Sequence, residues 1–195
     1  TLIAGSVQEV SGSQNGLWSS AYIYQVFGDI VVATSDTLII EPGVIIKFMN
    51  GYEFVVQGTL LAEGNETDSI RFTSGFLNQN KGDWEYIKFE QPATNSILSY
   101  AVIEYGTGIK FSNFYNSSNT VSITKNTIRY NSYAGIACIN SNNQVINNNI
   151  IKYNGGNAGI YNQNSSPVIS NNIICNNTTG VSCSSSSSPT IINNT

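Results

Sequence analysis

Acidic side chains that could act as catalytic acids or bases are confined almost entirely to the first half of the sequence. Of the 12 Asp and Glu residues, 11 lie before residue 91, and Glu104 is the last of them. Hydrolysis of a glycoside needs two carboxyl groups about 5–9.5 Å apart, and a calcium-dependent lyase needs several carboxylates around the ion. The second half of the chain therefore cannot hold either kind of site.

The remaining chemistry-bearing residue types are sparse. Asp83 and Glu85 flank a tryptophan, and Glu41 and Glu53 precede them, but each is better explained as a turn residue or a solvent-facing residue. The sequence contains no histidine, so no serine or cysteine has the base that a hydrolase triad requires. Three cysteines late in the chain do not form a disulfide framework, and we interpret them as small buried or half-buried side chains. We expect no catalytic residue, no metal ligand and no cofactor, with calcium left as an unsupported alternative.

Aromatic residues are the best binding candidates, because sugars stack on aromatic rings. The candidates for carbohydrate binding are Trp84, Tyr86, Tyr105, Tyr130 and Tyr153, and the competing interpretation of each is packing in the core or at a corner. The chain carries 8 basic residues without a cluster, which argues against nucleic acid as a partner. No apolar run approaches the length of a membrane span, so no membrane insertion is expected.

A repeat of about 23 residues organises the elements that must position these side chains. Segments 123–131, 146–154 and 169–177 align at offsets of 146 − 123 = 23 and 169 − 146 = 23 residues, and a further copy begins at Ile191. Each copy contains short apolar bursts separated by Asn, Ser or Gly, and such bursts are too short for helices. The pattern predicts strands that pair in parallel with the same strand of the next copy, about 4.8 Å away.

The fold class predicted is therefore all-β: a right-handed parallel β-helix of about seven turns. Asparagines at constant offsets mark the corners, since Asn tolerates the left-handed backbone region and its amide can bond to the next copy. The predicted structural ladder consists of Asn126, Asn149, Asn172 and Asn194, and a second column, Asn131, Asn154 and Asn177, marks another corner.

Two other columns follow from the same register. Tyr105, Tyr130 and Tyr153 are predicted to stack as an aromatic row. Glu104 aligns with Arg129 on the neighbouring turn, which predicts a surface ion pair contributing on the order of 0–1 kcal/mol.

The chain divides into an N-terminal cap and one β-helix domain. Residues 1–22 are polar and are predicted to form an irregular cap over the open end of the core, and residues 23–195 form the single domain. Segments 74–83 and 112–119 are expected to leave the coil as loops. The last copy stops partway, so we expect a truncated C-terminal end and a continuing or end-to-end β-helix contact there.

Several of these residues carry a resemblance to a known superfamily. The stretches Gly28–Val32, Thr37–Phe48 and Gly82–Phe89, followed by the Asn-Asn-x-Ile copies, resemble extracellular right-handed β-helix proteins of the pectate-lyase-like superfamily. The resemblance covers roughly residues 23–195. It implies an extracellular or cell-surface location, but it does not select a function, because the superfamily includes lyases, hydrolases, adhesins and proteins without known activity.

Three functions remain open at this point. The favoured one is a non-catalytic extracellular module that has a structural role or binds polysaccharide or another surface. The first alternative is a polysaccharide lyase or glycoside hydrolase of the pectate-lyase-like type. The second is an ice- or surface-binding protein that uses a flat β-helix face with outward β-branched columns.

Overall fold

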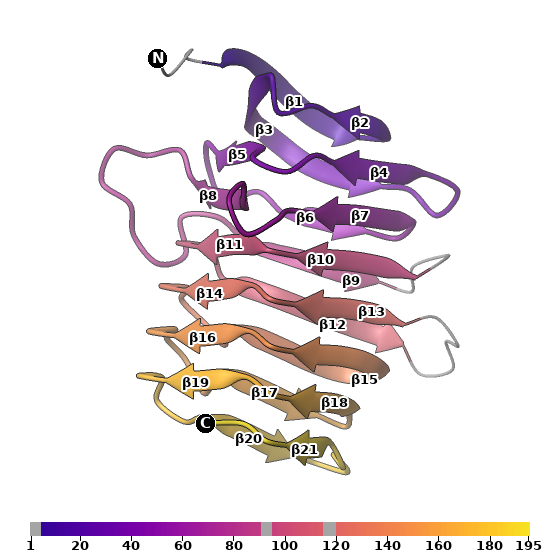
Figure 1. The fold of residues 1–195 in the computed structure, drawn as a ribbon, viewed down its shortest axis with the longest axis vertical. Helices are drawn as coiled ribbons and strands as arrows, with labels where there is room; N and C mark the ends of the chain where they lie inside the picture. Colours follow the sequence, from indigo (N-terminus) through magenta and orange to yellow (C-terminus); the bar gives the residue numbers. More distant parts are fainter. Residues whose placement is uncertain (1–4, 91–94, 115–119) are drawn as a thin grey trace.

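The computed structural model describes residues 5–90, 95–114 and 120–195, and these residues form a right-handed parallel β-helix (Figure 1). Twenty-one strands are connected into one sheet that coils around a single core, and paired strands run parallel. The predicted fold class and the estimate of about seven turns for residues 23–195 are confirmed. No helix long and apolar enough to cross a membrane occurs in the described part of the chain.

Each coil contributes one strand to each of three faces. The first face consists of the first part of β3 (Tyr22–Val32), β5 (Ile45–Phe48), β8 (Ile70–Ser74), β11 (Ala101–Glu104), β14 (Thr127–Arg129), β16 (Ile150–Lys152) and β19 (Ile173–Cys175). The second face consists of the second part of β3, β6 (Phe54–Val56), β9 (Tyr86–Glu90), β12 (Gly108–Phe114), the first part of β15 (Ile136–Asn147), β17 (Ile160–Gln163) and β20 (Val181–Ser184).

The third face consists of β2 (Gly16–Trp18), β4 (Thr37–Ile40), β7 (Thr59–Glu63), β10 (Ser96–Ser99), β13 (Val121–Thr124), the second part of β15, β18 (Ser166–Ser170) and β21 (Thr190–Ile192). In Figure 1 the first and third faces lie in front, as β10 and β11 show, and the second face lies behind them. Side chains alternate along each strand between the core and the outside, as the period of two requires.

The core is one continuous apolar column inside the coil. Its upper part is aromatic: Phe48, Phe54, Phe72 and Phe89 are fully buried, and Phe54 and Phe72 meet edge to face at 5.7 Å. The lower part is filled mainly by isoleucines. Ile128 and Ile151 face the core as predicted, and Ile174, near the end of the stack, packs against it while partly exposed.

The predicted asparagine column is a hydrogen-bonded ladder in the structure. Asn126 Nδ2 donates to Asn149 Oδ1 at 3.1 Å, and the same contact joins Asn149 to Asn172 and Asn172 to Asn194, each at 2.9 Å. The same side-chain oxygens also accept the backbone N–H of the asparagine above. Each buried amide is therefore satisfied by the next coil, which locks the register of the stack.

A second ladder follows the corner between the first and second faces. Asn131 Nδ2 donates to Asn154 Oδ1 at 2.9 Å, and Asn154 Nδ2 donates to Asn177 Oδ1 at 3.2 Å. Gly159 packs against this corner so closely that a Cβ there would lie 2.8 Å from Asn177 Nδ2 and 2.6 Å from Ile174 Cγ2. Gly135 has equally close contacts one coil earlier, whereas Gly180 near the end of the stack faces open space, so glycine is required at this corner where a further coil packs against it.

The left-handed corner conformation belongs to the residue before each ladder asparagine, not to the asparagine itself. In the first ladder this position is held by Lys125, Asn148, Asn171 and Asn193, with φ between 50° and 57°. In the second ladder it is held by Tyr130, Tyr153 and Asn176, with φ between 55° and 57°, and Tyr105 holds it one coil earlier, where Gly106 stands in place of the asparagine. The interpretation that ladder asparagines adopt this region was wrong, because their role is to bond inward while the preceding residue turns the chain.

The N-terminal segment is more regular than the irregular cap predicted for residues 1–22. Strands β1 (Ser6–Ser13) and β2 pair in parallel with β3 and β4, so they form a first coil at the end of the stack. Its alternation is weak, since Val10 is the one buried residue of β1. Residues 75–85, between β8 and β9, form the connection predicted for 74–83. In the segment predicted as a loop over 112–119, β12 extends to Phe114, and residues 115–119 lie outside the described part.

Replacing a ladder asparagine should destabilise the whole coil. In Asn149→Ala the backbone N–H and the amide of Asn126 lose their acceptor and the carbonyl of Ile123 loses its donor, all of them buried. We expect the free energy of unfolding to fall by about 2–4 kcal/mol, measured by urea denaturation. The exposed Asn157→Ala variant is the control, expected within about 0.5 kcal/mol of the parent, and equal effects of the two substitutions would contradict the role of the ladder.

Candidate functional site

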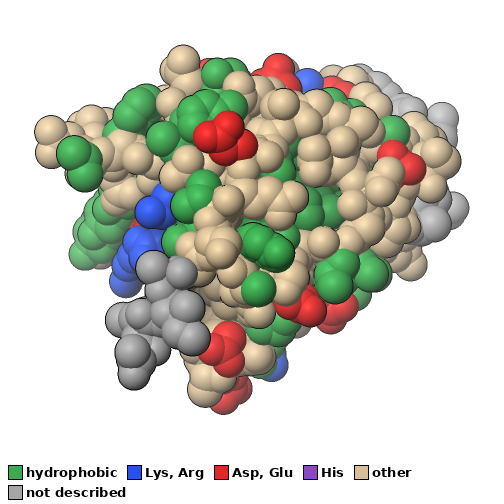
Figure 2. All heavy atoms as spheres, turned by 90° about the horizontal axis from the view of Figure 1, so that it is seen from above, with side chains coloured by type: hydrophobic (Ala, Val, Ile, Leu, Met, Phe, Trp, Pro, Cys, Tyr) green, Lys and Arg blue, Asp and Glu red, His purple; other side chains and the backbone are tan. Residues whose placement is uncertain are grey.

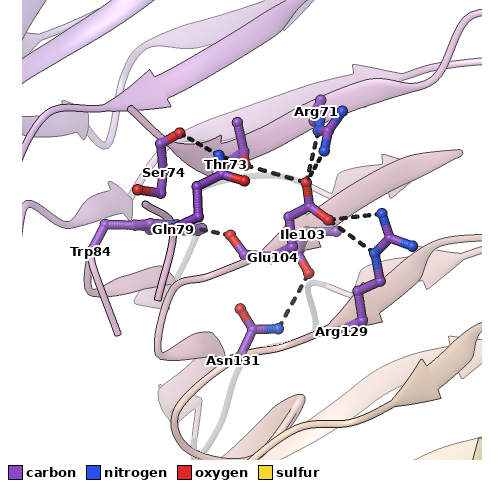
Figure 3. Close-up of polar contacts among 9 residues, drawn as sticks. All are labelled: Arg71, Thr73, Ser74, Gln79, Trp84, Ile103, Glu104, Arg129 and Asn131. Carbon is purple, nitrogen blue, oxygen red and sulfur yellow. Dashed lines mark hydrogen bonds and ion pairs between the residues drawn. The ribbon is translucent and has the colours of Figure 1, made fainter. Parts of the chain in front are cut away.

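A buried carboxylate lies at the centre of the first face, between two arginines (Figure 3). Glu104 Oε1 accepts hydrogen bonds from Arg71 Nε at 2.7 Å, from Arg71 Nη2 and from the Thr73 hydroxyl at 3.2 Å. Its Oε2 accepts from Arg129 Nε and Nη2, each at 2.9 Å. Three coils are thus joined through one carboxylate.

This network corrects the prediction of a surface ion pair. Glu104 is 0% exposed, although the alternation of β11 directs its side chain outward. The two arginines cover it, and Thr73 and the nearby Gln79 of the loop between β8 and β9 complete the enclosure (Figure 3). Removing one partner costs more in this environment than in an exposed pair, since the remaining charges are left without compensation.

Four cationic side chains follow the outside of this face from coil to coil. In the strand register Lys47 lies beside Thr73 of the following coil. The Thr73 hydroxyl donates a hydrogen bond to Glu104, one coil further along. The same column then continues through Glu104 and Arg129 to Lys152, and Arg71, two residues before Thr73, lies in the neighbouring outward column beside Val102. In Figure 2, which looks onto the N-terminal end, Lys and Arg side chains gather at one side of the molecule next to hydrophobic ones. We call Lys47, Arg71, Arg129 and Lys152 the basic strip.

The tyrosine row borders the basic strip at the adjoining corner. The rings of Tyr105 and Tyr130 stack at 5.8 Å between centroids, and those of Tyr130 and Tyr153 stack at 5.4 Å. Stacking covers the inner ring faces, so the row presents ring edges and hydroxyls, with Tyr153 40% exposed at its end. A sugar ring can therefore stack on Tyr153 at the end of the row. Along the side of the row it can only form hydrogen bonds with the tyrosine hydroxyls.

Cations of the strip lie against these rings. The guanidinium of Arg129 lies 5.6 Å from the centroid of Tyr130, and Lys152 Nζ lies 5.9 Å from that of Tyr153. The tyrosines hold the left-handed corner positions, which cost a non-glycine residue roughly 1–2 kcal/mol each. Stacking and cation–π contacts offset part of this cost, and they orient the row beside the strip.

Trp84 cannot take part in sugar stacking at the surface. Its side chain is 0% exposed and its ring stacks on Phe48 at 4.1 Å inside the core. The indole N–H donates to the Glu104 carbonyl at 3.1 Å. The competing interpretation, core packing, is correct here: Trp84 lies in the connection just before β9, where no strand alternation fixes its direction, and its ring fills the core against Phe48.

Tyr86 lies on the second face, away from the tyrosine row. Lys110 Nζ lies 5.1 Å from its ring centroid, and burial together with nearby Tyr133 and Glu85 raises its pKa to about 12. The five aromatic candidates are therefore separated: three form the row, one is on another face and one is in the core.

The sulfur ligands do not converge. Cys138 is buried in the core, and burial raises the pKa of its thiol far above the usual range, so it stays protonated. In the strand register Asn162 separates it from Cys183, while Cys175 lies outward on the first face. Within the described residues, no three His, Cys, Asp or Glu side chains are close enough to hold a metal ion.

Arg71 and Lys47 were missed by the reasoning from sequence, whereas the alignment of Glu104, Arg129 and Lys152 in one column is confirmed. Arg71 reaches Glu104 across 33 positions, because the loop between β8 and β9 lengthens that coil. The constant offset of 23 residues that revealed the other columns is absent here. The remaining signal was the pair of similar strand patterns Ile70–Thr73 and Ala101–Glu104, which is weak by itself.

Neutralising Glu104 should loosen the centre of the first face. Glu104→Gln keeps the shape of the side chain but leaves two arginines facing each other without a negative charge. We expect the free energy of unfolding to fall by about 1–3 kcal/mol. This is less than for a fully buried pair, because both arginines are partly exposed. Chemical denaturation of the single variants and of Glu104→Gln/Arg129→Gln gives the coupling energy. A coupling near zero would show that the network is not stabilising.

Alkaline pH should destabilise the protein partly through Tyr86. Its folded pKa of about 12 exceeds the ordinary value of 10.0, so the unfolded state releases its proton first and stability falls between these two values. Tyr86→Phe removes this contribution, and we expect a shallower loss of stability from pH 10 to pH 12 in denaturation series. Identical pH profiles for variant and parent would contradict the assignment.

A comparison with protein-family models finds a match over residues 66–195 to the family described as periplasmic copper-binding protein (NosD). Comparisons with curated proteins and with solved structures found no significant match. The matched residues span most of the chain and include the asparagine ladders, the buried Glu104 network and the tyrosine row. The chain therefore belongs to the NosD family, described as periplasmic.

Proposed function

We propose that this chain is a non-catalytic periplasmic β-helix module that binds polysaccharide along its first face. The observation that carries the proposal is the juxtaposition of the tyrosine row with the basic strip, which gives one elongated surface of ring edges, hydroxyls and cations. The tyrosines of this surface repeat with the coil, about every 4.8 Å. A linear polymer of repeating units can meet such a surface at several equivalent positions.

The state of the carboxylates supports a non-catalytic role. Glu104 is fixed between two arginines. Asp83 accepts from the Ser74 hydroxyl at 2.6 Å and from the Asn80 N–H at 2.9 Å, and Glu41 accepts from the Ser20 N–H at 2.9 Å. These groups have structural partners, whereas a glycosidase needs one carboxyl group free to give a proton and another to attack or activate water.

The copper in the family description does not fit the donors of this chain. Copper sites use imidazole, thiolate or thioether ligands, and the sequence has no histidine and one methionine. Cys138 is buried, and in the strand register Asn162 separates it from Cys183, so the described residues offer no converging set. We derive no step through copper.

The ice-binding alternative finds less support. Thr127, Ile150 and Ile173 do form an outward column, but it continues upward through Val102 to Arg71. The charged Arg71 interrupts this array. The other outward column, Ser122, Val145, Val168 and Thr190, carries no charge but continues upward through Ile97, Leu61, Ile39 and Leu17, so it lacks the regular threonine array that an ordered surface would match.

A glycan array with the purified chain tests the proposal, followed by calorimetry on the best ligand. Tyr153→Ala should weaken binding at least fivefold, since it removes the exposed end of the row. Tyr22→Ala is the matched control, because Tyr22 is 41% exposed and Tyr153 is 40% exposed, and it should change affinity less than twofold. Absence of any bound glycan, or release of reducing or unsaturated ends from one, would contradict a non-catalytic binding module.

A further inference from the structure

We propose that the polysaccharide bound by the first face is acidic, with carboxylates that pair with the basic strip; this inference rests on the proposed function and specifies its ligand. The chain as a whole has a net charge of −4. Against that background the first face is exceptional. Its strands from β5 to β19 carry Lys47, Arg71, Arg129 and Lys152, and their one carboxylate is Glu104.

The acidic residues on the second face are neutralised differently. Lys88 pairs with Glu90 at 2.7 Å and lies 3.9 Å from Glu53, so cations and carboxylates alternate there. On the first face the cations exceed the carboxylate by three: Arg71 and Arg129 pair with Glu104, and Lys47 and Lys152 lie on other coils of the same face. An anionic polymer is therefore attracted to the first face and not to the second.

Glu104 fixes the two arginines for this task. It contacts Nε and Nη2 of each guanidinium, and the Nη1 group of each makes no contact with it. Arg71 and Arg129 remain 44% and 33% exposed. They stand on coils two apart, about 10 Å along the axis from the strand spacing. Guanidinium groups held in place bind carboxylates with less loss of side-chain entropy than free ones.

The tyrosine row favours an acidic sugar over a simple polyanion. Arg129 and Lys152 lie over Tyr130 and Tyr153, so each of these cations has an aromatic ring beside it. A uronic acid residue offers a carboxylate for the cation together with hydroxyls and C–H groups for the tyrosine. An inorganic polyphosphate offers only the charge.

The test uses alginate oligosaccharides and the same oligosaccharides after reduction of their carboxyl groups, with binding measured by calorimetry at low and at physiological salt. We expect the acidic form to bind at least tenfold more tightly at low salt, and the difference to shrink as salt is added. Lys152→Gln should weaken binding of the acidic form at least fivefold. Arg71→Lys keeps the positive charge but removes the planar guanidinium group, and it should weaken binding of the acidic form at least threefold.

Lys125→Gln is the matched control. Lys125 also lies over a tyrosine, 4.8 Å from the ring centroid of Tyr100, but it is at the other corner of the first face and outside the strip. This substitution should change affinity less than twofold. Thermal unfolding by circular dichroism verifies that each variant is folded before its affinity is compared.

The outcomes separate the two proposals. Equal binding of the acidic and the reduced oligosaccharides would overturn the acidic ligand and leave polysaccharide binding in place. Binding of neutral glycans without binding of acidic ones would likewise overturn the acidic ligand and leave polysaccharide binding in place. Failure of every glycan would overturn both, and tighter binding of polyphosphate than of alginate would show that the strip recognises charge without sugar.

Discussion

The vertical hydrogen bonds of the asparagine ladders are the constraint on which the rest of the structure depends. Each amide donates to a backbone carbonyl of the preceding coil and to the amide oxygen of the following coil, so no coil can slide without leaving buried polar groups unpaired. A slip of one residue would also turn the core side chains outward. The ladders thus hold successive coils in one register, and this register alone brings residues more than 20 positions apart into columns.

Columns in register turn single side chains into extended surfaces. The tyrosine row exists because the left-handed corner position is occupied by tyrosine on three successive coils, where asparagine occupies it on the fourth. The basic strip exists because Lys47, Arg129 and Lys152 share a column and Arg71 lies beside it. Such a surface is suited to a repeating ligand.

Membership of a family named for copper binding does not determine what this chain binds. The fold provides the scaffold, and the function depends on the side chains placed on it. Here the sulfur ligands are dispersed, whereas cations and tyrosines are gathered on one face. The arrangement of side chains therefore supports a binding surface for a polymer more strongly than a metal centre.

The sequence by itself determined the parallel β-helix, the asparagine columns and the tyrosine row, because all of them follow from a constant offset of about 23 residues. Tertiary structure decided the rest. Which side chain of an irregular coil faces inward depends on the loop before it, so Trp84 proved to be core. The burial of Glu104 and its pairing with Arg71 depend on a long insertion that breaks the offset, so no local pattern could reveal them. A sequence repeat reveals contacts that recur from coil to coil. A contact made once, across an insertion, produces no repeat in the sequence.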